Sequence, residues 1–117
     1  YKKISKLPKE IGRLSNLKEL FLSNNKIVKI PKEIGNLINL EELYLSANKI
    51  VELPKEIGKL KKLRTLLLSY NFVVEVPKEI GQLSNLRYLC LHNNNLNKKG
   101  TDIKSLFESS QFLRISA

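Results

Sequence analysis

The sequence is poor in cysteine: it has one, Cys90, and contains neither methionine nor tryptophan. A single cysteine excludes a disulfide within the chain and a Cys/His cluster that would hold a metal. Because small secreted domains usually depend on disulfides, we expect an intracellular setting, above all the cytoplasm, with the nucleus as the alternative. The chain starts at Tyr1 rather than at a methionine, so whether it is a fragment stays open and the lack of a signal peptide carries no weight.

Long hydrophobic runs and acidic residues are also scarce. The uncharged segment Thr65–Val74 is far too short to cross a bilayer and holds polar residues, so we expect no membrane association. The chain has 11 acidic residues against 21 Lys and Arg, which gives a net charge of +10. This balance favours an acidic protein partner or, as an alternative, nucleic acid. The length of 117 residues suffices for one domain, and we expect a monomer.

Motifs for catalysis are missing. The sequence has no phosphate-binding loop, no paired-carboxylate motif and no Ser-centred motif. Cys90 and His92 are two positions apart, and a Cys–His pair can in principle activate a thiolate. An open strand surface lacks the pocket and the orienting third group that such chemistry requires. We therefore predict no enzymatic activity, no cofactor and no metal ion.

What the sequence has in abundance is a repeat of 23 residues. The motif PKEIG occurs four times, at 8–12, 31–35, 54–58 and 77–81. Leucines keep the same spacing, and self-similarity with this period is the signature of a solenoid. We divide the single domain 1–117 into a partial repeat 1–7, four repeats at 8–30, 31–53, 54–76 and 77–99, and a C-terminal cap at 100–117.

Four segments share the pattern L-x-x-L-x-L-x-x-N-x-L, namely Leu17–Ile27, Leu40–Ile50, Leu63–Val73 and Leu86–Leu96. The pattern resembles that of the leucine-rich-repeat family. The form LPxEIGxLxNLxxLxLSxNxI is similar to the intracellular subclass of Ras-pathway scaffolds, bacterial cytosolic repeat proteins and domains fused to messenger-RNA deadenylases. The resemblance implies an α/β fold: a right-handed leucine-rich-repeat solenoid with a short parallel β-sheet on its concave face and helical or 3-10 turns on its convex face.

The chemistry of the residues agrees with this fold. Each L-x-L forms a short strand that can bury its leucines only when the repeats stack. An asparagine amide both donates and accepts hydrogen bonds, so it can satisfy the buried backbone of two turns. The resemblance implies a structural ladder of such asparagines, which are Asn25, Asn48, Asn71 and Asn94.

The motif PKEIG predicts one helical turn per repeat. Proline suits the first helical position, and glycine can end the turn in a left-handed conformation. Apolar residues at spacing three, such as Ile11, Leu14 and Leu17, should face inward from a 3-10-like segment.

The two ends depart from the repeat. Lys2 occupies the ladder position of the partial repeat, and an uncovered first strand would expose apolar core. At the other end, Asp102–Ser110 predicts a slightly longer helix with Thr101 or Asp102 as its N-cap. Phe112–Ser116 predicts a last strand, with Leu113 and Ile115 inward after a one-residue insertion.

A column of outward-facing residues lies between the paired leucines of the strands: Phe21, Tyr44, Leu67 and Cys90. A contiguous exposed apolar patch usually marks a binding site, and aromatic and Arg residues usually carry the binding energy. The alternative is that these side chains only stabilise the sheet. The predicted partner-binding residues are Phe21, Tyr44, Leu67, Tyr70, Arg64, Arg87 and Tyr88.

Three hypotheses for function follow. The first is a protein-interaction module, an adaptor, a scaffold or a recognition domain, that binds a protein partner on the concave face. The second, implied by the resemblance, is a partner-docking domain of a larger deadenylase-type protein. The third is direct RNA binding by the lysines, which we rank lowest because the aromatics that would stack on bases lie on another face.

Overall fold

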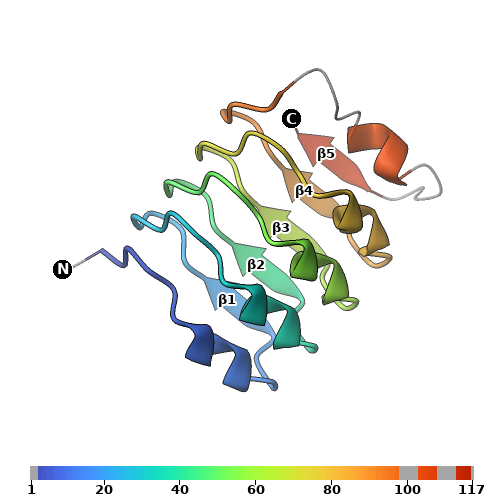
Figure 1. The fold of residues 1–117 in the computed structure, drawn as a ribbon. Coiled ribbons are helices and arrows are strands. Elements are labelled where there is room, and N and C mark those ends of the chain that lie inside the picture. Colours follow the sequence, from blue (N-terminus) through green and yellow to red (C-terminus); the bar gives the residue numbers. More distant parts are fainter. Residues whose placement is uncertain (1–2, 98–102, 108–112, 117) are drawn as a thin grey trace.

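The computed structural model describes residues 3–97, 103–107 and 113–116, and it confirms a leucine-rich-repeat solenoid (Figure 1). One layer is a sheet of short strands, and the other is a row of 3-10 helices in front of it in this view. The strands are β1 (Glu19–Phe21), β2 (Glu42–Tyr44), β3 (Thr65–Leu67), β4 (Tyr88–Cys90) and β5 (Arg114–Ser116). The 3-10 helices are η1 (Lys9–Arg13), η2 (Lys32–Asn36), η3 (Lys55–Lys59), η4 (Lys78–Gln82) and η5 (Ile103–Phe107).

The sheet is parallel throughout and follows chain order from β1 to β5. The leucines Leu20, Leu43, Leu66 and Leu89 pair in register, one 23-residue period apart. Leu89 then pairs with Ile115, 26 positions later, so the last repeat holds a three-residue insertion. The predicted one-residue insertion is therefore wrong. Because η5 starts 25 positions after η4, two of the three extra residues lie before η5 and one lies between η5 and β5.

The core lies between the two layers and consists of the repeated leucines and isoleucines. Leu43, Leu66 and Ile57 are fully buried. The expectation that Ile11, Leu14 and Leu17 all face inward is wrong for Leu14, which is 50% exposed. Leu14 is exposed because no earlier repeat of the described chain covers the first repeat, whereas its counterparts Leu37 and Leu60 are fully buried. Of the predicted longer C-terminal helix, the structure describes η5; Thr101, Asp102 and residues 108–110 lie outside the described residues.

Proline and glycine serve other purposes than predicted. Pro31 has an extended backbone (φ −71°, ψ 154°) and is the N-cap of η2, which begins at Lys32. None of the described glycines has a positive φ. Gly35 instead lies inside η2, where a Cβ atom would come within 2.8 Å of the backbone oxygen of Glu56 in the next repeat. Glycine is therefore required because successive helices approach each other closely.

The substitution Gly58→Ala tests this close approach. Its Cβ atom would meet the backbone oxygen of Glu79 at 2.5 Å, which η3 and η4 can relieve only by moving apart. Overpacking of this kind costs about 1 to 3 kcal/mol, more than the helix propensity of alanine returns. We expect the free energy of unfolding, measured in urea, to fall by about 2 kcal/mol. Lys55→Ala, at an exposed position of the same helix, is the control and should change it by less than about 0.5 kcal/mol.

The asparagine column forms a continuous ladder of hydrogen bonds. The Oδ1 atom of Asn71 accepts a bond from the backbone N–H of Ile50 at 3.0 Å. Its Nδ2 group donates to the carbonyl oxygens of Leu45 and Leu68, also at 3.0 Å. Asn48 and Asn94 repeat this arrangement, so each amide joins its own turn to the turn of the repeat before it. Within the described residues no buried side-chain nitrogen or oxygen lacks a hydrogen-bond partner.

Removal of one ladder amide should destabilise the protein according to its burial. In Asn71→Ala, one backbone N–H and two carbonyl groups lose a partner inside the molecule, at about 1 to 3 kcal/mol each. We expect a loss of about 3 to 5 kcal/mol in the free energy of unfolding. The matched control is Asn25→Ala, because Asn25 bonds to the exposed N–H of Ile4, which water can satisfy. Equal losses for the two variants would show that the ladder is not what stabilises these turns.

Candidate functional site: the open face of the sheet

The face of the sheet that points away from the 3-10 helices carries the predicted binding residues. Burial alternates along each strand: in β2, Leu43 is fully buried while Glu42 and Tyr44 on either side are half-buried. The register places Phe21, Tyr44, Leu67 and Cys90 on neighbouring strands, in one line across the sheet. We call these four residues the central column.

The aromatic side chains at the start of the central column touch. The ring centroids of Phe21 and Tyr44 lie 4.6 Å apart, with the planes tilted by 41°. Phe21 is nevertheless 58% exposed, because β1 has no neighbouring strand on its other side in the described chain. Leu67 and Cys90 continue the column and are half-buried. The central column therefore exposes most apolar surface at its β1 end, where Phe21 lies.

Tyr44 is held in place by a carboxylate. Its hydroxyl group donates a hydrogen bond of 2.7 Å to Oε1 of Glu42 on the same strand. This bond stabilises the neutral phenol and raises the pKa of Tyr44, and desolvation and the charges of Glu42 and Glu19 act in the same direction. The ring is thus fixed over the sheet with its polar end already paired, and its apolar face and Phe21 remain available for contact.

The pKa of Tyr44 gives a test of this arrangement. In Glu42→Gln the charged acceptor is gone, so the pKa of Tyr44 should fall toward the ordinary value of about 10. Since the pKa is raised in the folded state, the contribution to stability is complete below about pH 10 and is lost as the pH rises through the folded value. The measurement is an NMR titration of the Tyr44 ring. Glu19→Gln, which removes only the weakest cause, is the control and should shift the pKa less.

A basic hollow lies at the edge of this face where the strands begin. It has a volume of about 320 Å³ and is lined by Glu41, Lys62, Arg64, Asn85 and Arg87. The predicted Arg64 and Arg87 therefore come together, one exposed and one half-buried. Sequence reasoning did not place Lys62 and Asn85 in the protein-binding site, because only positions around the strands were considered for that surface. Three cations facing one carboxylate make the hollow suited to an anionic group.

Tyr70 and Tyr88 lie at opposite ends of the strands: Tyr88 at the start of one and Tyr70 after the end of another. Tyr88 precedes the central column on β4 and is 52% exposed. Tyr70 follows β3 at a turn, has a left-handed backbone (φ 58°) and is 60% exposed. Its ring meets the ring of His92 edge-on, with the centroids 5.5 Å apart. A bulky residue with positive φ is unusual, because its side chain crowds the backbone. In two of the other repeats asparagine, which tolerates this conformation, takes the same position.

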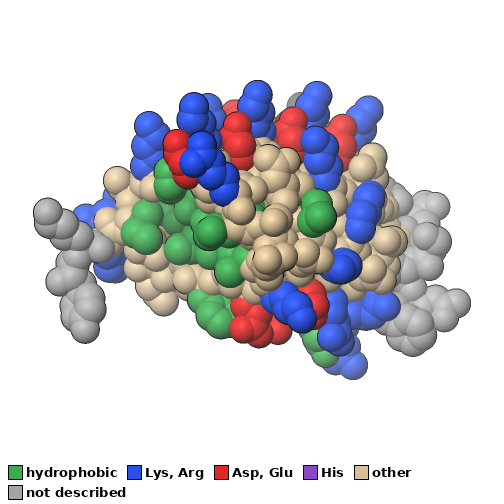
Figure 2. All heavy atoms as spheres, turned by 90° about the horizontal axis from the view of Figure 1, so that it is seen from below, with side chains coloured by type: hydrophobic (Ala, Val, Ile, Leu, Met, Phe, Trp, Pro, Cys, Tyr) green, Lys and Arg blue, Asp and Glu red, His purple; other side chains and the backbone are tan. Residues whose placement is uncertain are grey.

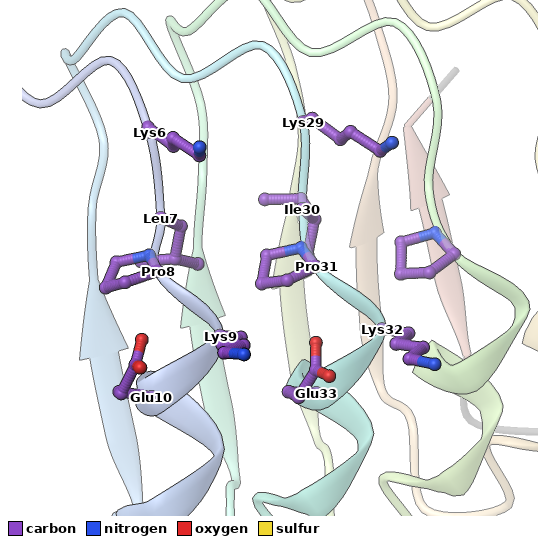
Figure 3. A pocket seen from close by; sticks show the side chains of 11 residues that line it. Lys6, Leu7, Pro8, Lys9, Glu10, Lys29, Ile30, Pro31, Lys32 and Glu33 are labelled. Atoms are coloured by element: carbon purple, nitrogen blue, oxygen red, sulfur yellow. The ribbon is translucent and has the colours of Figure 1, made fainter.

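Two further apolar surfaces lie outside the open face of the sheet. The sequence predicts the first, at the uncovered N-terminal end, and does not predict the second, a groove. Hydrophobic side chains gather toward the left, N-terminal end of the solenoid in Figure 2. At the N-terminal end of the chain, Ile4 and Leu14 are 42% and 50% exposed. A groove of about 610 Å³ lies beside the 3-10 helices of the first three repeats (Figure 3). Its apolar lining is Leu7, Pro8, Ile30, Pro31 and Pro54. Lys and Glu side chains flank the groove, so it too is an amphipathic surface.

Two kinds of feature are not found in the described part of the chain. No group of three or more His, Cys, Asp or Glu residues there could hold a metal ion. No helix there is long and apolar enough to span a membrane.

Comparison with known proteins identifies the family. A model described as leucine-rich repeat region matches residues 32–113, and a second leucine-rich-repeat model matches residues 2–50. The chain belongs to the leucine-rich-repeat family. No curated protein matches the sequence.

Solved structures with the same architecture come from bacteria and plants. A leucine-rich-repeat protein of Leptospira interrogans is 46% identical over 98% of this chain and 29% of its own, with a TM-score of 0.91. The ectodomain of the Arabidopsis thaliana receptor kinase SOBIR1 is 34% identical over 95% of this chain and 60% of its own, with a TM-score of 0.82.

The ectodomain of the Arabidopsis thaliana receptor kinase GASSHO1/SCHENGEN3, solved in complex with CASPARIAN STRIP INTEGRITY FACTOR 2, is 28% identical over 97% of this chain and 14% of its own, with a TM-score of 0.85. The chain thus spans less than two thirds of each of these three structures.

Proposed function

We propose that the protein is a non-catalytic interaction module, an adaptor, a scaffold or a recognition domain, that binds a protein partner on the open face of its sheet. The observation that carries the proposal is the aromatic pair of exposed Phe21 and half-buried Tyr44 on the open face, which continues into Leu67. Phe21 is 58% exposed although its ring already packs on Tyr44, so support of the sheet leaves much of its surface unused. A related solenoid, that of GASSHO1/SCHENGEN3, was solved in complex with a partner, which supports this use of the fold.

The proposed contact has an apolar part and a charged part. Phe21, Tyr44 and Leu67 provide the apolar anchor, and Tyr70 and Tyr88 extend it at the two ends of the strands. Arg64 and Arg87, with Lys62 beside them, would receive an acidic group of the partner in the basic hollow. The partner we propose is therefore an acidic protein segment with an exposed apolar side chain, in an intracellular setting.

The test is affinity capture with wild-type protein and the variant Phe21→Ser/Tyr44→Ser/Leu67→Ser, after circular dichroism has shown that the variant is folded. Loss of central anchors usually costs more than about 1.4 kcal/mol, so we expect the affinity for the captured protein to fall at least tenfold.

The matched control is Leu14→Ser/Ile38→Ser, which removes two apolar side chains, 50% and 58% exposed, away from the central column. It should bind like wild type. If the sheet variant retains its partner as well as the control does, the aromatic pair serves only the sheet and the proposal is wrong.

A further inference from the structure

The charges on the open face of the sheet are acidic at one end. Glu19 of β1 pairs in register with Glu42 of β2, and Glu41 comes directly before β2. Lys18, directly before β1, leaves three carboxylates against one cation at these positions. The whole chain has only 11 acidic residues against 21 Lys and Arg, so this end of the face runs against the general excess of cations.

The other end of the same face is basic. Arg64 comes directly before β3 and Arg87 directly before β4, and both line the basic hollow. Arg114 opens β5, in register with Tyr88. Thr65 and Tyr88 take the places on β3 and β4 that carboxylates take on β1 and β2. The sign of the charge therefore changes between β2 and β3.

These charges are not paired with one another across the sheet. Among the described residues, no ion pair involves Glu19, Glu42 or Arg64, and Glu19 and Arg64 are exposed. Glu42 accepts the hydroxyl bond of Tyr44 through Oε1, which leaves its charge in place. Like charges in register on adjacent strands destabilise a sheet, so the fold itself gains nothing from Glu19 beside Glu42.

The two charged ends are close enough for one short segment to reach both. They are two strand spacings apart, or about 10 Å. An extended chain advances about 3.3 Å per residue, so side chains about three positions apart would meet the two ends. The central column crosses the same strands beside the charges, with Phe21, Tyr44 and Leu67 on β1 to β3.

We propose that the charges fix the direction in which a partner crosses the open face. The partner is an extended protein segment with a basic residue toward β1 and β2 and an acidic residue toward β3 to β5. An apolar side chain near these two residues packs on Phe21, Tyr44 and Leu67. This direction presupposes the proposed binding on the open face and adds to it the order of charges along the partner.

A partner of uniform charge fits this face less well. A polyanion such as single-stranded RNA would be attracted by Arg64 and Arg87 but repelled by Glu19 and Glu42, and a basic segment would meet the reverse problem. Like-charge contacts in an interface cost affinity and exclude wrong partners. An acidic group therefore fits only where the partner meets the basic hollow.

The first step of the test is a selection from a phage-displayed library of random peptides about 12 residues long, enough to span the whole sheet when extended. Wild-type protein is the target. We expect the selected peptides to share a Lys or Arg and an Asp or Glu about three positions apart, with an apolar residue near them.

Charge exchange then tests the direction, with the affinity of a selected synthetic peptide measured by fluorescence anisotropy. Lys62→Glu/Arg64→Glu makes the basic hollow acidic, and Glu19→Lys/Glu42→Lys makes the other end basic. Each should lower the affinity at least tenfold. Replacing the acidic residue of the peptide by Lys should restore at least tenfold affinity for the first variant and none for the second. Replacing its basic residue by Glu should do the reverse.

Two controls make the same changes in net charge away from the open face. Lys55→Glu/Lys78→Glu matches the first variant and Glu52→Lys/Glu75→Lys matches the second, and all four side chains are exposed. Both controls should bind the peptide like wild type, which separates the position of the charges from an effect of net charge alone. Circular dichroism of every variant checks that it is folded.

Several results would overturn the proposal: selected peptides without separated charges, charge variants that bind like wild type, exchanged peptides that restore no affinity, or single-stranded RNA that binds wild type more tightly than the peptides. The variant Phe21→Ser/Tyr44→Ser/Leu67→Ser distinguishes this failure from that of the proposed function. Peptides that lose affinity for this variant alone overturn only the order of charges. Peptides that bind it like wild type contradict the proposed apolar contact itself.

Discussion

The structure depends on one constraint: after each strand the chain must turn into the interior, and the backbone groups of that turn must still find partners. The ladder of Asn48, Asn71 and Asn94 meets this need, because each amide accepts one bond and donates to two turns. The bonds link residues 21 and 26 positions apart, so they hold only while the repeat keeps its length. The fixed period of 23 residues is thus a consequence of hydrogen bonding as much as of packing.

The fold could be predicted because the same leucine pattern occurs in every 23-residue repeat, so each repeat supports the same assignment of strand and buried face. Leucines at constant spacing predict both the strand and the face that it buries, and the structure places Leu43 and Leu66 accordingly. The last repeat escaped prediction because the period is broken there: without a copy to compare, a three-residue insertion resembled one of a single residue. Local rules also misplaced Pro31 and Gly35, since helix-end preferences say nothing of how closely η2 and η3 approach.

The candidate site could be predicted in part. Alternation along the strands sufficed to place Phe21 and Tyr44 on one face, and their contact follows from the register. The hollow around Arg64 and Arg87 was harder to predict from the sequence, because Lys62 and Asn85 line it from loops whose course depends on tertiary structure.

The frame that fixes the fold also leaves two surfaces free to vary. Residues that face the core or form the ladder must keep the same type in every repeat. The strand positions around Tyr44 and the outer positions around Val51 take no part in core packing or in the ladder, so their residue types can differ. In this chain the two surfaces differ in kind. The open face of the sheet is asymmetric, with aromatic surface toward β1 and cations toward β4, and such a surface fits a partner unlike itself. The outer face instead presents the exposed side chains of Val28, Val51 and Val74 beside the charges of Lys29, Glu52 and Glu75.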